Sequence, residues 1–392
     1  MDTVLKPITI HKTVLRIAVG AMFFMAGLCF ASWASRIGTV QHKLGLSYST
    51  FGLVLFSLPV GLSLSLPFSG WIISKVGSKR VLLTAITGYG LVLIGLGLAQ
   101  NTIQLVVCLA LYGFAGNTVN ISVNTQAVAT EKLHDKPIMA SFHGLWSGAG
   151  FMGGMIGAFM IGKRIDPFHH FIIILVIVLI TIVIASKYLY DDHLEAKNAP
   201  VNTLSIREKL RLMIPLLPLG SIAFCSMICE GAMFDWSVIY FKNVLSAPSA
   251  IEGYGFAAFM FTMAGGRFIA DYFSHRFGLR RTLQVSGSLT VTGLLIAVIF
   301  PHVYTAMAGF MLVGAGVSSV VPMVYSAAGK SKTMSPGVAL AAVSTIGFVG
   351  FLVGPPVIGF IAGLATLRAS FLFVGLMGAL VVILSTRAKL DS

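Results

Sequence analysis

The chain has 392 residues, of which 56% are hydrophobic and only 10% are charged. Soluble domains carry roughly a quarter charged residues, so this composition excludes an ordinary soluble protein and indicates an integral membrane protein. A net charge of +14 would suggest nucleic-acid binding in a soluble protein. Here the basic residues lie in short loops between apolar stretches, where membrane orientation explains them, and no nucleic-acid partner is expected.

Uncharged stretches long enough for a membrane-spanning helix, which needs about 20 mainly apolar residues, recur along the chain. Two of them are too long for one helix, and Asn101-Thr102 and Pro301-His302 divide them. Two further helices, at about 212–241 and 251–275, contain charged residues, so twelve helices are predicted in all. The uncharged stretches lie at 17–35, 44–74, 81–130, 137–162, 167–186, 282–329, 333–367 and 369–386.

Basic residues alternate between the loops in the way that twelve helices predict. Most fall in segments that share one side with the two termini, and few, such as Lys43 and Lys242, fall on the other. Positive loops are typically cytoplasmic, so both termini are expected in the cytoplasm. The longest hydrophilic stretch follows the sixth helix and predicts an N-terminal six-helix bundle at 1–188, a cytoplasmic linker at 189–210 and a C-terminal six-helix bundle at 211–392.

An internal repeat supports two halves. Trp33 and Gly52 have the same spacing as Trp236 and Gly255, which lie 203 residues further along the chain. Parallel repeats of six helices are the plan of one large transporter fold.

The first helix ends in Trp33 and Arg36, which lie one turn apart. A tryptophan at this level could be an interfacial anchor, and Arg36 could reach headgroups or water. Alternatively, Arg36 meets Asp235 of the seventh helix and the two form an outer gate.

The fourth and fifth helices carry polar side chains at helical spacing. Asn117, Asn120 and Asn124 are predicted to share one face of the fourth helix. Carboxamides donate and accept hydrogen bonds, which suits a hydroxyl-rich solute, although such groups also join helices to one another. On the fifth helix, His143 and Trp146 lie one turn apart, and His143 could relay protons, donate to a solute or simply pack as a neutral residue.

The seventh helix contains two carboxylates, Glu230 and Asp235, followed by Trp236. A charged side chain in hydrocarbon costs about 2.5–3.5 kcal/mol on insertion scales, so such residues are candidates for function. The alternative is that Glu230 only joins helices. About 140° separates the two carboxylates on an ideal helix, which predicts separate roles. Glu230 would lie deep and bind a proton beside a polar group of helix one, four or five, and Asp235 would lie near the mouth.

Two loops share a pattern of glycine and basic residues, one at 70–80 and one at 266–281. Both resemble the cytoplasmic loop signature of the major facilitator superfamily, in outline Gly-x-x-x-Asp-Arg-x-Gly-Arg-Arg. The resemblance implies that these residues help to hold the cytoplasmic side shut. Ser74 departs from the pattern by standing where the family usually has Asp, so the first charge latch is incomplete. In this sequence, the positions that match the signature form the implied cytoplasmic gate. They are Gly70, Gly77, Lys79, Arg80, Arg267, Asp271, Arg276 and Gly278.

The second loop keeps its acidic residue. Asp271 follows Arg267 by one turn, a spacing that suits an ion pair.

Three passages, 32–37, 120–126 with 141–147, and 230–237, resemble a bacterial branch of the superfamily related to fucose-permease-type sugar carriers. Members of that branch commonly have Asp where this chain has Asn120. One potential proton carrier is therefore missing, which gives Glu230 more weight.

These observations predict an all-α membrane protein with twelve transmembrane helices in two pseudo-symmetric six-helix bundles. It is expected to be a secondary active transporter that moves a small polar solute, sugar-like by preference, by alternating access and coupled to protons. The expected partners are that solute, protons and the lipid bilayer. The chain is expected to act as a monomer in a bacterial inner membrane.

Neither an enzyme nor a cofactor is expected. The sequence has no phosphate-binding loop of the Gly-x-x-x-x-Gly-Lys-Ser/Thr form and no convincing set of nucleophile, histidine and acid. Its cysteines lie in apolar stretches without further ligands at metal-site spacing, so no metal is expected. They are Cys29, Cys108, Cys225 and Cys229.

Two alternatives stay open. The 17 Met and 28 Phe residues are compatible with a proton-coupled exporter of hydrophobic compounds on the same fold. A membrane receptor or scaffold that binds without transporting is the other alternative.

Overall fold

The computed structural model describes residues 12–134, 138–191, 216–329 and 336–387, and these are almost entirely helical. The first half of the chain contains seven described helices. They are α1 (Lys12–Lys43), α2 (Tyr48–Leu55), α3 (Ser57–Val76), α4 (Ser78–Leu98), α5 (Thr102–Glu131), α6 (Met139–Gly162) and α7 (Pro167–Ala185).

The described part of the second half is built in the same way. It consists of α9 (Leu217–Asn243), a short 3-10 helix η3 (Ser249–Ile251), α10 (Tyr254–Ile299), α11 (Val303–Gly329), α12 (Pro336–Leu364) and α13 (Leu367–Arg387). Helix α10 is two helices in one, because Gly278 interrupts it with a non-helical backbone.

The helix count confirms the predicted fold class. Among the described residues, eleven helices are long and apolar enough to cross a membrane, with α2 and α3 together forming one of them. The part of α10 before Gly278, which carries Arg267, supplies the twelfth. Breaks fall where the sequence placed them: α5 begins at Thr102, and α11 begins at Val303 directly after Pro301-His302.

Side-chain caps explain several helix starts. The Asn101 side chain accepts a hydrogen bond from the Gln104 amide, and that of Asp166 accepts one from the Phe168 amide. The Glu131 carboxylate accepts from the amides of Ile138 and Met139 at 2.7 and 2.8 Å, at the beginning of α6. Each cap satisfies amides that have no partner inside their own helix.

Two glycines turn the chain sharply at corresponding places in the two halves. Gly77, between α3 and α4, has φ 83° and ψ 154°, and Gly278, inside α10, has φ 78° and ψ 162°. This backbone region is essentially restricted to glycine. The repeated loop pattern therefore reflects a repeated backbone conformation.

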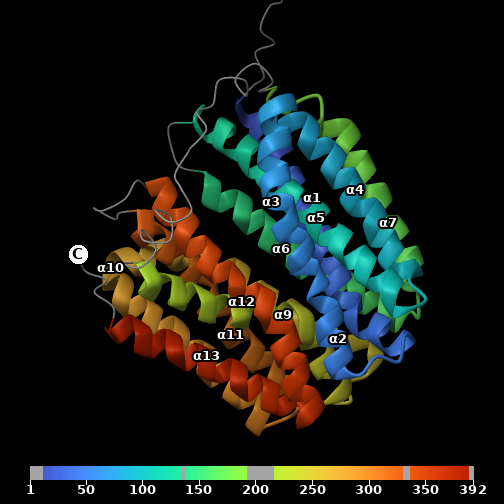
Figure 1. Ribbon diagram of the computed structural model, residues 1–392, viewed down its shortest axis with the longest axis vertical. Helices are drawn as coiled ribbons and strands as arrows, with labels where there is room; N and C mark the ends of the chain where they lie inside the picture. The colour runs from blue at the N-terminus through green and yellow to red at the C-terminus, as the bar shows by residue number, and fades with distance from the viewer. Residues whose placement is uncertain (1–11, 135–137, 192–215, 330–335, 388–392) are drawn as a thin grey trace, which may run out of the picture.

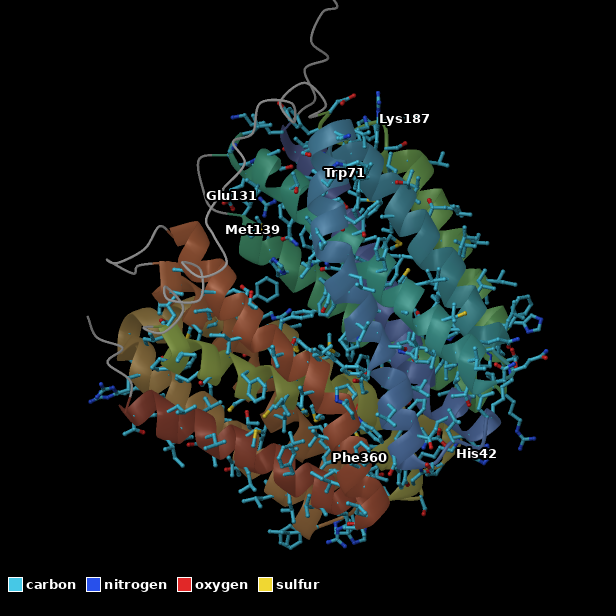
Figure 2. The ribbon with its side chains drawn as sticks, in the orientation of Figure 1. His42, Trp71, Glu131, Met139, Lys187 and Phe360 are labelled. Carbon is cyan, nitrogen blue, oxygen red and sulfur yellow. The ribbon has the colours of Figure 1, made fainter. Side chains whose placement is uncertain are left out.

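The helices form two bundles side by side, one coloured blue to green and one yellow to red in Figure 1. Figure 2 shows Trp71, Glu131 and Lys187 at one end of the molecule, here named the Trp71 side, and His42 and Phe360 toward the other, named the His42 side.

The bundles pack closely on the His42 side. A Cβ added to Gly52 of α2 would lie 2.6 Å from the Pro355 carbonyl oxygen of α12, and one added to Gly154 of α6 would lie 3.2 Å from the Ala257 Cβ of α10. The helix backbones thus approach one another as small residues allow in membrane bundles. The predicted linker at 189–210 falls mostly in 192–215, outside the described residues.

Candidate functional site

Glu230 lies at the middle of α9 and is paired with an arginine. Its Oε1 is 3.4 Å from Nη2 of Arg267, which lies near the middle of the first part of α10. The two side chains are 10% and 19% exposed. The expected partner on helix one, four or five is therefore wrong: the carboxylate meets a guanidinium from its own half of the chain.

Arg267 also reaches the other bundle. Its Nη1 donates a 2.7 Å hydrogen bond to Oγ of Ser147 on α6, and its guanidinium carbon lies 5.8 Å from the centre of the Trp146 ring. One side chain therefore joins α9, α10 and α6 across the boundary between the bundles. A guanidinium over an indole face is also a favourable cation–π arrangement.

Four aromatic side chains, here named the aromatic cluster, surround this level of the molecule: Phe30 of α1, Trp146 of α6, Phe234 of α9 and Phe351 of α12. Phe30 lies 5.6 Å from Trp146 and 4.9 Å from Phe234, measured between ring centres. Phe234 stacks on Phe351 at 6.3 Å with an interplanar angle of 3°. Both bundles contribute rings, so the cluster spans the boundary on which the Glu230–Arg267 pair lies.

Two further titratable side chains lie near the pair. His143 of α6 is half-buried, contacts the Phe23 ring edge-on at 5.4 Å and interacts electrostatically with Arg267. Tyr325 of α11 interacts with the charge of Glu230. His143 and Trp146 thus both lie near Arg267.

The asparagine stripe of α5 divides between two environments. Asn117 is buried and donates to Oγ of Ser65 at 2.7 Å and to the Leu62 carbonyl at 3.3 Å, so it joins α5 to α3. Asn120 is exposed, and Asn124 is half-buried and donates to the Asn120 side chain at 2.8 Å. Asn120 and Asn124 keep free hydrogen-bonding capacity, whereas both Asn117 amide contacts serve helix packing.

Arg36 and Asp235 are not paired, which corrects the predicted outer gate. The Arg36 side chain, 2% exposed, donates to Nδ1 of His170 at 3.2 Å and to the Ile165 carbonyl, so it anchors the start of α7. Asp235 is half-buried and has no hydrogen bond or ion pair within the described residues. The cause is local: the first turn of α7 and the residue before Asp166 offer Arg36 these two acceptors.

The two repeat-related tryptophans are fully buried. Trp33 is 1% and Trp236 0% exposed, which rules out the interfacial anchor for Trp33. Trp236 packs against Tyr48 and Phe51 of α2 across the bundle boundary, with ring centres 6.3 and 6.2 Å apart. Neither indole N–H has a hydrogen-bond partner within the described residues.

The residues of the implied cytoplasmic gate do not gather in one place. Gly77 and Gly278 make the sharp turns, Lys79 is half-buried beside the exposed Arg80, and exposed Gly70 has no heavy atom within 4 Å of an added Cβ. Arg276 donates to the Tyr272 hydroxyl at 2.9 Å. Arg267 points to Glu230, and the side chain of Asp271 lies outside the described residues.

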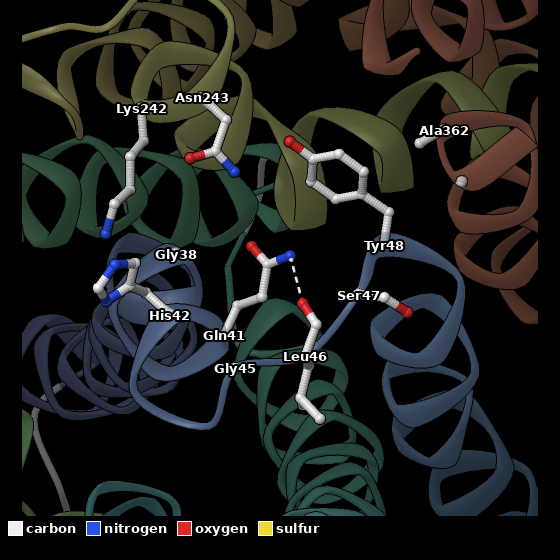
Figure 3. A pocket seen from close by; sticks show the side chains of 11 residues that line it. Gly38, Gln41, His42, Gly45, Leu46, Ser47, Tyr48, Lys242, Asn243 and Ala362 are labelled. Carbon is white, nitrogen blue, oxygen red and sulfur yellow. Dashed lines mark hydrogen bonds between the residues drawn. The ribbon is translucent and has the colours of Figure 1, made fainter. Parts of the chain in front are cut away.

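A cavity of about 620 Å³ opens on the His42 side, between the ends of α1 and α9 and the start of α2 (Figure 3). Gln41, His42, Tyr48 and Lys242 line it, and Gln41 donates to the Leu46 carbonyl at 3.2 Å. Nearby Glu252 is 6% exposed; burial raises the pKa of its carboxyl, and Lys242 opposes that shift.

Sequence reasoning missed Ser147, Phe30 and Phe234 as parts of the site, and assigned Arg267 to a gate. An arginine inside a predicted spanning segment was the available signal for Arg267. Within the described ranges, no group of three or more His, Cys, Asp or Glu could hold a metal ion.

A family model described as Major Facilitator Superfamily matches residues 17–331 and 239–391. An uncharacterized MFS-type transporter of Yersinia pestis is 31% identical over 366 residues, which are 93% of each chain. Membrane protein MosC of Rhizobium meliloti is 30% identical over 364 residues, 93% of this chain and 88% of that protein.

Two solved structures share the fold. The nucleoside transporter NupG aligns with a TM-score of 0.74 at 13% identity, over 96% of this chain and 99% of that one. The human organic anion transporter MFSD10 aligns with a TM-score of 0.71 at 16% identity, over 96% and 99%.

Proposed function

The chain belongs to the Major Facilitator Superfamily and is a membrane transporter of that type, and on this premise we propose that it couples protons to the movement of a small polar solute. Alternating access around a site near the bilayer midplane would move the solute. Glu230 would carry the proton, and the solute would bind between Arg267, Trp146 and the Asn120–Asn124 pair.

The observation that carries this proposal is the Glu230–Arg267 pair and its link to Ser147. A proton on Glu230 would neutralise the carboxylate that holds Arg267 on one side. Arg267 would then be free to shift relative to Ser147, which belongs to the other bundle. Protonation of Glu230 would thereby be linked to the Arg267–Ser147 contact, which has to break and form again as the two bundles move relative to each other.

The proposed solute is polar, and a sugar-like ring is favoured. Trp146 and Phe30 offer flat apolar faces, and the Asn120 and Asn124 carboxamides offer donors and acceptors. The gating role of the two glycine-rich loops remains part of the proposal. So do a monomer and a bacterial inner membrane with the Trp71 side in the cytoplasm.

The test uses purified protein in proteoliposomes, with a solute found by screening sugars, sugar acids, nucleosides and amino acids. Glu230→Gln should abolish accumulation driven by a proton gradient while solute-for-solute exchange continues, because exchange needs no net proton movement. Asp235→Asn is the matched carboxylate control on the same helix, and it should keep more proton-driven accumulation than Glu230→Gln does. Unchanged accumulation by Glu230→Gln would contradict the coupling.

A second candidate function, export of hydrophobic compounds, is favoured by the aromatic cluster. Phe30, Phe234 and Phe351 could receive an apolar molecule as well as a sugar face. Proton-driven efflux of apolar dyes, together with no response to any polar solute, would select this function.

A further inference from the structure

The Glu230–Arg267 pair balances the charge of the site. Arg267 is its cation and Glu230 its carboxylate. Among the described residues, the other titratable groups within electrostatic reach of the pair are His143 on α6, beside Arg267, and two groups beside Glu230. These two are Tyr325 on α11 and the Cys229 thiol on α9, both of which are neutral at physiological pH. Asp235 lies further along α9 and has no hydrogen bond or ion pair with the described residues. The empty site therefore has a net charge near zero.

The geometry leaves Arg267 only partly satisfied. Its contact with Glu230 is a single 3.4 Å approach, longer than the 2.7–2.9 Å typical of charge-assisted hydrogen bonds. Ser147 takes one other donor, and the Trp146 face covers part of the guanidinium. A guanidinium has five N–H donors in a fork that matches a carboxylate, so a second carboxylate could bind it better than Glu230 does.

Charge balance then determines which solutes can be coupled to a proton. A proton on Glu230 alone would leave Arg267 as an uncompensated cation at the midplane. A solute carboxylate alone would give the site two anions for one cation. Each state is costly in a low-dielectric interior. When both bind, the site is neutral again, so proton and anion each favour the binding of the other.

From this we infer that the transported solute carries a carboxylate, which binds Arg267 in place of Glu230 while Glu230 holds the proton. The inference rests on the proposed function and names the class of its solute. The aromatic cluster indicates that the carboxylate is attached to a ring with a flat face, either an aromatic ring or a sugar ring. The reason is that Trp146 lies beside the guanidinium and Phe30 lies beside Trp146. A neutral sugar would lack the group that replaces Glu230.

The experiment measures binding to purified full-length protein by thermal shift and calorimetry. The probes are matched pairs: benzoate and benzyl alcohol, 4-hydroxybenzoate and 4-hydroxybenzyl alcohol, glucuronate and glucose. Such carboxyls have pKa values of about 4, so they stay ionised between about pH 7.5 and 5.5. The variants are Glu230→Gln, Arg267→Gln and Arg267→Lys, with Arg164→Gln as the matched control, because Arg164 is exposed and lies between α6 and α7, outside both glycine-rich loops.

The wild-type protein should bind at least one acid and none of the neutral partners. Its affinity should rise about tenfold per pH unit of acidification, since one proton binds with each anion. Glu230→Gln should bind the acid with an affinity that no longer changes with pH, because its Arg267 is permanently free. Arg267→Gln should lose binding, Arg267→Lys should retain part of it, and Arg164→Gln should behave as wild type.

Binding of a neutral partner as tightly as its acid, or of no acid in the panel, would overturn the inference. So would a pH dependence that persists in Glu230→Gln. These results are separable from failure of the proposed function. If a neutral solute is accumulated with protons and Glu230→Gln abolishes that accumulation, the function stands and only the solute class is wrong.

Discussion

At the scale of single residues, the chemistry of the site comes from Glu230 and Arg267 on neighbouring helices. Glu230 could be selected from the sequence, because a carboxylate inside an apolar helix is rare. Its partner, Arg267, could not be identified from the sequence. The spacing of Arg267 and Asp271 favoured a pair along one helix, whereas the structure turns Arg267 toward α9. Which way a long side chain points depends on helix packing, which local sequence does not encode.

The same limit explains Asn117 and Arg36. Helical periodicity correctly placed Asn117, Asn120 and Asn124 on α5, yet Asn117 bonds to α3 because Ser65 lies opposite it. Arg36 bonds to His170 because α7 is its neighbour. Periodicity predicts a shared face, but the neighbouring helix decides what each side chain contacts.

Replacing Ser147 with alanine tests the link between Arg267 and α6. A hydrogen bond to a charged group is worth about 1.5 kcal/mol, so kcat/KM for transport should fall about tenfold. Ser226→Ala is the matched control, since its buried hydroxyl has no hydrogen-bond partner within the described residues. The measurement is initial uptake in proteoliposomes, and equal effects of the two changes would remove Ser147 from the account.

At the scale of elements, the helix ends were readable because they rest on local chemistry. Asn101 caps α5, and the Pro301-His302 break separates α10 from α11. The turns at Gly77 and Gly278 were visible as a repeated loop pattern, although their shared positive φ required the structure.

Substituting Gly278 with alanine should destabilise the protein by about 1–3 kcal/mol, the cost of a residue with a Cβ in this backbone region. The cost is purely conformational, because an added Cβ would meet no heavy atom within 4 Å. Gly70→Ala is the control: Gly70 is helical and equally uncrowded, so alanine should be neutral or stabilise by about 0.5–1 kcal/mol. Unfolding in SDS compares the two, and the same effect in both would refute the strain at Gly278.

At the scale of the whole molecule, two bundles meet closely on the His42 side and share the Glu230–Arg267–Ser147 contacts at mid-depth. The twelve helices and the two-bundle plan followed from composition, loop charges and the repeat, since these features are distributed along the entire chain. The contacts between the bundles could not be predicted from these features, because they depend on which conformation of the transporter the chain adopts.

Gly52→Val should loosen the His42 side, because even a Cβ would lie 2.6 Å from the Pro355 carbonyl oxygen of α12. A cysteine in place of Ser49, whose hydroxyl donates to the Gly359 carbonyl at 3.4 Å, reports the change through faster maleimide labelling. Gly88→Val on α4, where an added Cβ has no heavy atom within 4 Å, should leave labelling unchanged. Identical labelling rates in the two variants would contradict a glycine-dependent closure.

The most direct test of the central claim, that Glu230 carries the proton, is to measure proton flux itself. Addition of a transported solute to lightly buffered wild-type proteoliposomes should make the medium more alkaline as protons enter with the solute. Glu230→Gln liposomes should show no alkalinisation while still exchanging labelled solute. Alkalinisation of equal rate and extent in the variant would contradict the account.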